Sequence, residues 1–236
     1  MLELTPDIVA SLGWSIWEPD GKTLLCIGHE RGGSGLHRVA ADGSGATKQL
    51  WWEQSAVAEG NWPRFSTAGG TAGGGGPLVL AIIKQSSTHP RDVWIADGHS
   101  AAAAGATSTT GAIHFRQATE MNPQSAQIQL PPVEIVEWNG ADGWSMQGLY
   151  YPPAPSIEAT SNGEQRPPAT LMYVHGGPIG VQTDNYVAGS AGGPCSIALL
   201  QQAGYAVFSP NCKTLSVGTD STIHRRVCTV YIDIDM

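Results

Sequence analysis

Glycine and proline recur along this chain and set the first limit on how it can fold. The 236 residues include 30 glycines and 16 prolines, which together make up almost a fifth of the sequence. Both residues interrupt helices and favour tight turns, so this composition favours short strands and turns over long helices. Hydrophobic residues account for 41% of the chain, enough for one large domain or for pieces of two.

The charge balance argues against several classes of partner. The net charge is −8, and the acidic residues are spread along the sequence. Neither a nucleic acid nor an anionic membrane surface would be attracted by such a field. The N-terminus shows no basic and apolar signal sequence, and no apolar run approaches the roughly 20 residues that span a bilayer. We therefore expect a cytoplasmic protein without a membrane partner.

Cysteine and histidine show none of the spacings of a metal site. The seven histidines form no HExxH or HxxxH pair. The four cysteines form no CxxC pair and are interpreted as free thiols: Cys26, Cys195, Cys212 and Cys228. Neither a metal nor a cofactor is expected.

Residues 1–130 consist of short strand patterns separated by turn signals. Pro19-Asp20-Gly21 predicts a turn before a strand at Thr23–Ile27, because proline presets φ, aspartate caps its own backbone and glycine accepts a positive φ. An Ala-Asp-Gly turn follows a strand pattern at residues 41–43 and again at 96–98. A repeat of about 55 residues with several strands predicts β-propeller blades, and a generic β-meander is the alternative. The eight tryptophans are expected mainly in the cores of these blades.

The pattern changes after residue 130. Two alternating segments, 133–138 and 144–151, flank an Asn-Gly turn signal and predict a hairpin. A strand at 169–174, a helix at 196–203 and a strand at 205–208 follow in that order. The order strand, helix, strand predicts an α/β unit whose sheet is at least partly parallel.

The segment from Leu171 to Pro178 carries the clearest chemical signal. An apolar, β-rich run stops at His175-Gly176-Gly177-Pro178. Glycines at the end of a buried strand let the bare backbone approach a carbonyl group and point N–H groups at a developing oxyanion. The glycines could instead serve a tight turn, and His175 could either donate to the oxyanion or only orient the loop. We interpret the segment as an oxyanion loop for acyl-transfer chemistry.

A series of short motifs around this loop resembles the prolyl oligopeptidase family of serine peptidases, in the branch of acylaminoacyl and dipeptidyl peptidases. The motifs occur in the family's order over about 100 residues, a span that is specific when taken together. They are Arg116-Gln117-Ala118-Thr119, Asn122-Pro123, Val136-Glu137-Trp138, Ala141-Asp142-Gly143, Gly148-Leu149-Tyr150-Tyr151-Pro152, Tyr173-Val174-His175-Gly176-Gly177-Pro178 and Gly204-Tyr205-Ala206-Val207-Phe208-Ser209-Pro210-Asn211.

The resemblance implies an architecture and a reaction. It implies partial β-propeller blades, all-β, over residues 1–130, followed by the N-terminal part of an α/β-hydrolase domain over residues 131–211. It also implies hydrolysis of peptide or acylaminoacyl bonds through an acyl-enzyme, with a peptide as the substrate. Gly177 matches the family position that supplies an oxyanion N–H. Asp142 is interpreted as a turn residue rather than a catalytic acid.

The sequence departs from the family after Asn211. No GxSxG nucleophile motif follows, and no catalytic Asp or His can be carried over from the family. We therefore expect that the catalytic triad is absent, that residues 212–236 are an unmatched and aberrant tail, and that the chain is an inactive fragment truncated before the catalytic serine. A non-catalytic, propeller-like interaction module is the alternative. Ser100 lies in a Gly-His-Ser-Ala-Ala sequence that resembles GxSxG, but it precedes the oxyanion loop and is interpreted as a blade-loop residue.

Overall fold

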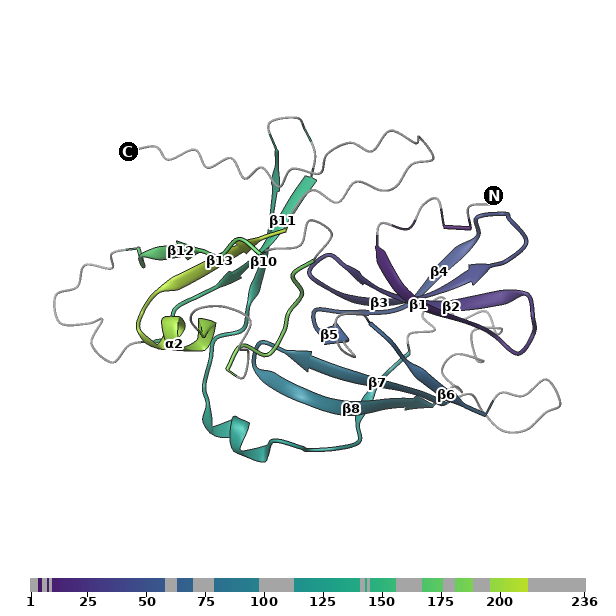
Figure 1. Cartoon of the computed structure of the whole chain (residues 1–236), viewed down its shortest axis with the longest axis horizontal. Coiled ribbons are helices and arrows are strands. Elements are labelled where there is room, and N and C mark those ends of the chain that lie inside the picture. Colours follow the sequence, from purple (N-terminus) through teal and green to yellow (C-terminus); the bar gives the residue numbers. More distant parts are fainter. Residues whose placement is uncertain are drawn as a thin grey trace.

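The described residues form three separate open sheets and very little helix. The computed structural model describes residues 4, 5, 8, 10–57, 63–69, 79–97, 113–140, 143, 145–155, 167–175, 181–188 and 196–211. Within these residues the sheets have four, five and four strands. The first two sheets lie together, and the third lies on the other side of the molecule (Figure 1). The expectation of a nearly all-β N-terminal half is confirmed, and the described strands do not close into a propeller.

The first sheet is an antiparallel meander in the order β1-β2-β3-β4. Its strands are β1 (Ser11–Trp17), β2 (Thr23–Glu30), β3 (Gly33–Ala40) and β4 (Thr47–Glu53). The predicted turn between β1 and β2 is present. Asp20 Oδ1 accepts hydrogen bonds from the backbone N–H groups of Lys22 at 2.8 Å and Thr23 at 3.0 Å, and Gly21 has a φ of 65°. Aspartate capping and a glycine at positive φ therefore fix the turn as the sequence predicts.

The second sheet repeats this antiparallel arrangement less regularly. It runs in the order β5-β7-β8-β9, with β6 also paired to β7. Its strands are β5 (Ala56–Val57), β6 (Ser66–Ala68), β7 (Val79–Ser86), β8 (His89–Asp97) and β9 (Arg116–Gln117). The two long strands, β7 and β8, are joined by a tight turn at Ser87 and Thr88.

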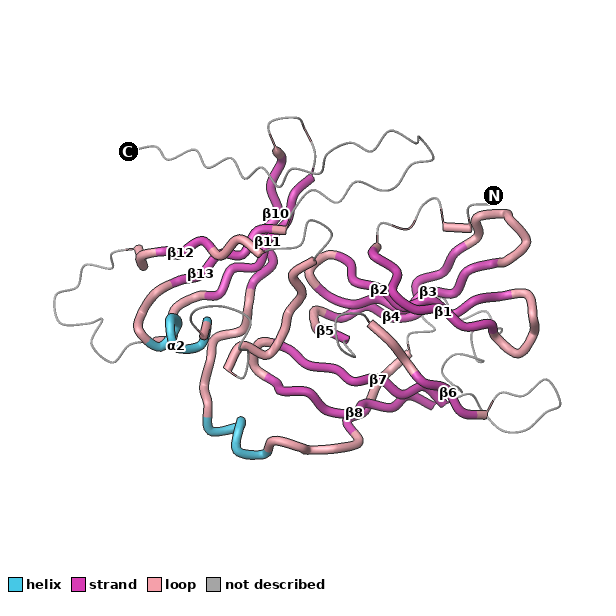
Figure 2. Tube along the Cα trace, viewed as in Figure 1, coloured by secondary structure: helices cyan, strands magenta, loops and turns pink. Residues whose placement is uncertain are grey.

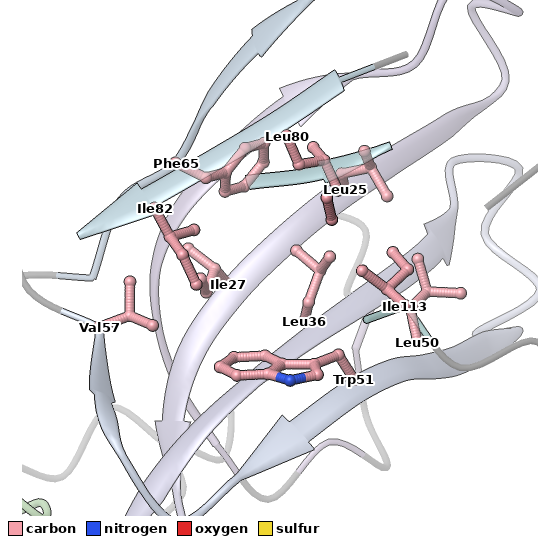
Figure 3. Packing of buried hydrophobic residues seen from close by; sticks show 11 residues of the cluster. Leu25, Ile27, Leu36, Leu50, Trp51, Val57, Phe65, Leu80, Ile82 and Ile113 are labelled. Atoms are coloured by element: carbon pink, nitrogen blue, oxygen red, sulfur yellow. The ribbon is translucent and has the colours of Figure 1, made fainter. Parts of the chain in front are cut away.

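One apolar core joins the first two sheets. Side chains from β2, β3 and β4 meet side chains from β7 between the sheets (Figure 3). Ile27 and Val57 have no exposed surface, and Leu36 is 1% exposed. Ile113 lies in the same core, where its N–H donates to Leu50 O at 3.0 Å. Burial of these aliphatic groups is the main force that holds the two sheets together.

Trp51 lies in the shared core and Trp94 packs against it, as expected for the tryptophans, but the two tryptophans of β1 are exposed. Trp17 is 60% exposed and Trp14 is 39% exposed, whereas Trp51 on β4 is 8% exposed. β1 is the edge strand of the first sheet, so it has a strand neighbour on one side only. The guanidinium of Arg64 lies 4.9 Å from the ring centre of Trp14 and covers part of its exposed face.

The third sheet combines a hairpin with a parallel pair. Its order is β10-β11-β13-β12, where β10 is Glu134–Asn139, β11 is Ser145–Tyr151, β12 is Thr170–Met172 and β13 is Ala206–Pro210. The β10–β11 hairpin is antiparallel, as predicted, and β12 pairs with β13 in parallel. Helix α2 (Ile197–Gln202) connects the parallel strands, so the predicted order strand, helix, strand is confirmed. A 3-10 helix, η2 (Pro123–Gln127), lies in the connection that precedes this sheet, and Figure 2 shows both helices in cyan.

The third sheet has its own apolar core. Leu149 and Val207 face it from adjacent strands, Ala198 reaches it from α2, and Val187 reaches it from a loop. On the other face of the sheet, the Phe208 ring packs across the strand at Gly148, where an added Cβ would lie 2.7 Å from the ring. Glycine at position 148 therefore leaves room for the Phe208 ring against β11.

We expect the shared core of the first two sheets to control the stability of the N-terminal half. Leu36→Ala removes a side chain that is 1% exposed and should lower the free energy of unfolding by about 2–5 kcal/mol. Leu199→Ala is the matched control, because Leu199 is 65% exposed, and it should change the value by less than about 1 kcal/mol. Urea unfolding followed by tryptophan fluorescence measures both. Equal losses in the two variants would contradict the assigned core.

Candidate active site

The candidate site lies at the carboxyl ends of the parallel strands β12 and β13. Met172 pairs with Phe208, and the pairing continues beyond β12 because Tyr173 N–H donates to Phe208 O at 2.8 Å. His175 follows two residues later and is half-buried. Parallel strands present their carboxyl ends at one sheet edge, which is where α/β sheets bind ligands. The apolar run therefore delivers His175 to a position suited to a ligand.

Three of the predicted site positions lie outside the described residues. Gly176 and Gly177, the two glycines of the predicted oxyanion loop, follow His175 directly and fall there, as does Ser100. Their predicted roles therefore rest on the sequence and on the position of His175. The loop that contains them follows the third strand of its sheet and precedes helix α2. Lipases and esterases carry their HGGG oxyanion motif in the loop between the third strand and the first helix.

Asn211 fixes the chain next to this edge. It follows β13 directly and is 4% exposed. Its side chain forms a pair of hydrogen bonds with the backbone of Gln182: Gln182 N–H donates to Asn211 Oδ1 at 2.6 Å, and Asn211 Nδ2 donates to Gln182 O at 3.0 Å. The N–H of Asn211 donates to Gln147 O at 2.9 Å. The Asn211 side chain thus ties segment 181–188, which follows Gly176 and Gly177 in the chain, to the end of β13.

Segment 181–188 continues from this contact as an irregular stretch with buried polar groups. Asp184 is 4% exposed and accepts a hydrogen bond from the N–H of Ser87, in the β7–β8 turn, at 2.5 Å. Burial raises the pKa of Asp184 to about 6, and the charge of Glu53 adds to the rise. Hydrogen bonds from the backbone and side chain of Ser87 and from the side chain of Gln54 lower the pKa, but by less than burial raises it. An acid with this pKa changes charge close to neutral pH.

Sequence reasoning missed Asp184 for a physical reason. Its partner Ser87 lies 97 residues earlier in the chain, and no local pattern marks a contact at that separation. The flanking sequence is polar and contains no strand or helix periodicity. Asn211, by contrast, belongs to the last of the motifs that carry the family resemblance, so a signal for its importance was present.

A contact between a serine and a histidine in the first sheet does not form a second catalytic site. His29 Nδ1 lies 3.3 Å from Ser34 Oγ. Ser34 has no exposed surface, and its hydroxyl donates to Ser55 O at 3.0 Å and accepts from the N–H of Val57 at 2.9 Å. Burial lowers the pKa of His29 to about 4. This hydroxyl is inaccessible to a substrate, and its hydrogen bonds hold β5 against β3.

Two further features limit the chemistry. No cluster of three or more His, Cys, Asp or Glu side chains suited to a metal ion occurs among the described residues. Cys26 is buried as a free thiol, and the other cysteines lie outside the described part of the chain.

In the part of the chain that the structure covers, none of the helices has the length and apolar character needed to cross a membrane.

Comparison with solved structures identifies peptidases of the prolyl oligopeptidase family. The AtxE2 isopeptidase with Astexin3-dC4 bound is 16% identical, with a TM-score of 0.53 over 84% of this chain and 25% of that chain. The acylaminoacyl peptidase of Pyrococcus horikoshii is also 16% identical, with a TM-score of 0.52 over 88% of this chain and 26% of that chain. The chain therefore shares the fold of one part of these proteins and spans about a quarter of their length. No family model and no curated protein matches the sequence.

The raised pKa of Asp184 predicts a defined pH dependence of stability. Its ordinary pKa of 3.8 applies to the unfolded chain, and the value in the folded protein is about 6. The folded state therefore binds the proton of Asp184 more tightly than the unfolded chain does. The stabilisation of the folded protein by this proton is complete below about pH 4 and is lost as the pH rises through about 6. Asp184→Asn should remove this pH dependence. Between pH 4 and pH 7 the free energy of unfolding of the wild type should therefore fall by about 2–3 kcal/mol relative to that of the variant. Urea unfolding at a series of pH values measures the difference, and parallel curves for the two proteins would contradict the assignment.

Proposed function

We propose that this chain is part of a serine-type peptidase of the prolyl oligopeptidase family, which hydrolyses peptide or acylaminoacyl bonds through an acyl-enzyme. The observation that carries the proposal is the position of His175. It lies at the carboxyl edge of a parallel strand pair, at the start of a loop that joins the third strand of the sheet to a helix. The fold likeness to an isopeptidase and an acylaminoacyl peptidase supports the same class of reaction.

The proposed division of the chain follows its sheets. Residues 1–130 would supply propeller blades, and two antiparallel sheets with short turns support this assignment. Residues 131–211 would begin the α/β-hydrolase domain, supported by a hairpin followed by parallel strands joined through α2. Residues 212–236 remain unmatched to the family in sequence.

In this proposal the loop at residues 175–177 stabilises negative charge on the substrate carbonyl. Gly177 would donate a backbone N–H to the oxyanion, and Gly176 would let the backbone approach the carbonyl carbon without a side chain in between. His175 would either donate to the oxyanion or orient the loop. A peptide carbonyl bound there would lie at the edge where Asn211 and Gln182 hold the neighbouring backbone.

The covalent step needs a nucleophile that these 236 residues do not offer in the family's form. No GxSxG sequence is present, and the resemblance assigns no catalytic Asp or His. Loss of the nucleophile removes most of the rate enhancement of a serine hydrolase, because an oxyanion loop alone cannot form an acyl-enzyme. We therefore propose that the 236-residue polypeptide by itself does not hydrolyse peptides.

Inactivity of the polypeptide is directly measurable. Purified chain incubated with aminoacyl- and acylaminoacyl-nitroanilides should release no nitroaniline above a buffer blank, and a fluorophosphonate probe should label no serine. The Pyrococcus horikoshii acylaminoacyl peptidase serves as the positive control for both assays. Turnover that is abolished by serine reagents, or labelling at Ser100, would contradict the proposal. A stable binding partner recovered with an inactive chain would favour the interaction-module alternative.

The oxyanion role is testable in a complete enzyme. Residues 169–211 of this chain replace the corresponding segment of the Pyrococcus horikoshii acylaminoacyl peptidase, and the chimera should retain peptidase activity. Gly177→Pro in the chimera removes one N–H and should lower kcat by about 10²–10³ with little change in KM. Gly204→Asn is the matched control: Gly204 has a φ of 85°, no atoms lie near an added Cβ, and asparagine accepts this conformation. An unchanged kcat in the Gly177 variant would rule out an oxyanion donor there.

A further inference from the structure

Segment 181–188 is buried although it forms no helix or strand. Thr183 and Val187 are each 3% exposed, and Asp184 is 4% exposed. A buried irregular segment must find partners for its backbone polar groups outside regular structure. Figure 1 shows this segment as the green loop between the third sheet and the ends of β7 and β8. Its hydrogen bonds reach all three sheets.

On one side the segment contacts turns of the first two sheets. Asp184 N–H donates to Gly32 O, in the β2–β3 turn, at 3.0 Å, while the Asp184 carboxylate accepts from the N–H of Ser87. Gln85 holds the next residues, because its Nε2 donates to Asn185 Oδ1 at 2.9 Å and its Oε1 accepts from the N–H of Tyr186. Asp184 is therefore bonded to turns of both N-terminal sheets at once.

On the other side the segment packs against the third sheet. Val187 lies in the core with Tyr151, which is 2% exposed, and Tyr173 packs against the same cluster. Burial raises the pKa of Tyr151, and its neighbours Asp184 and Tyr173 add to the rise. Tyr151 therefore lies near both side chains. Tyr173 in turn precedes His175 by two residues.

We infer that Asp184 is a positioning residue. Its backbone N–H and its carboxylate fix segment 181–188 on turns of the two N-terminal sheets. Val187 of that segment packs in one core with Tyr151 and Tyr173, so the segment sets the position of Tyr173 at the carboxyl end of β12. The inference deepens the proposed function, because His175 and the loop that begins there depend on where this strand ends. The contacts themselves do not depend on that function. They predict that the N-terminal sheets and the candidate site are coupled through one residue, Asp184.

The groups around Asp184 make this coupling sensitive to its charge. Ser87 and Gln54 donate hydrogen bonds to the carboxylate, whereas Glu53 lies near enough to repel it. Glu53 is itself paired with Lys84 at 2.5 Å, and Lys84 Nζ also lies over the Trp94 ring.

The charges on the β2–β3 turn have their own partners. Glu30 is paired with Arg31 at 3.6 Å and with His37 at 3.1 Å. From the third sheet, Tyr151 lies close enough to Asp184 to interact with its charge, and Tyr173 is a neighbour of Tyr151. Protonation of Asp184 would weaken the hydrogen bonds from Ser87 and Gln54, and it would remove the negative charge beside Tyr151.

Tyrosine resonances report this charge without substrate. In protein labelled with [13Cζ]tyrosine, the signals of Tyr151 and Tyr173, assigned by Tyr→Phe substitutions, are followed from pH 4 to pH 8, a range in which tyrosine itself does not titrate. Both signals should show an inflexion near pH 6. Asp184→Asn should abolish it, and Asp42→Asn, which alters an exposed turn carboxylate, should leave it unchanged.

A second variant keeps the inference testable if Asp184→Asn fails to fold. Gln54→Met removes one donor to the carboxylate and should move the midpoint to higher pH, because the charged form loses a stabilising hydrogen bond. A flat Tyr173 signal in the wild type, or an inflexion that survives Asp184→Asn and disappears in Glu53→Gln, would overturn the inference. Either result would leave the oxyanion proposal standing, since the Gly177→Pro chimera tests that separately.

Discussion

The burial of segment 181–188 is the constraint on which the relation between the two halves of the chain depends. The first two sheets share one apolar core and the third sheet has another. Between them lies an irregular segment whose polar groups must be paired because water is excluded. The pairs are supplied by the backbone N–H of Ser87 and the side chain of Gln85 from the N-terminal half, and by the side chain of Asn211 directly after β13. Directional hydrogen bonds, together with the packing of Val187, therefore set how the third sheet meets the others.

Pairing the buried segment through hydrogen bonds has an energetic cost at Asp184. A carboxylate in a buried position loses hydration, and the donors around Asp184 only partly replace it, so its pKa rises to about 6. An asparagine could accept the same hydrogen bond from Ser87 without a charge. The carboxylate adds a proton-dependent property that an amide would not have.

Local signals in the sequence account for much of the fold. The turn at Asp20 and the β10–β11 hairpin are encoded within a few residues, because turn geometry follows from aspartate and glycine in sequence and strand faces follow from alternation. Exposure was harder to predict. Tryptophan is a large apolar residue of the kind expected in a core, but Trp17 lies on an edge strand and is exposed. The sequence of a strand does not determine whether that strand lies at the edge or in the middle of its sheet.

The candidate site divides in the same way. The stop of an apolar run at His175 is a local pattern, and His175 does follow a strand of a parallel pair. The prediction that this strand is buried is wrong: β12 is an edge strand, with Leu171 42% and Met172 39% exposed. Asp184 acquires its role only from Ser87, 97 residues away, so no reading of its neighbours could have identified it. Contacts of this kind are decided by tertiary packing, after the strands and turns have formed.

Stabilisation of an oxyanion depends on donors that are held in place before the charge develops, because reorganisation during the reaction would consume the gain. Glycine restricts its own backbone less than other residues do, so neighbouring residues must hold such donors in place. The described residues on either side of the two glycines are well held: β12 is paired to β13 and extended by Tyr173, and the backbone of Gln182 is held twice by Asn211. Asp184 lies two residues beyond Gln182 and is bonded to turns of both N-terminal sheets. If the proposed function holds, those sheets contribute to catalysis by limiting where the glycine loop can move, in addition to any contact they make with a substrate.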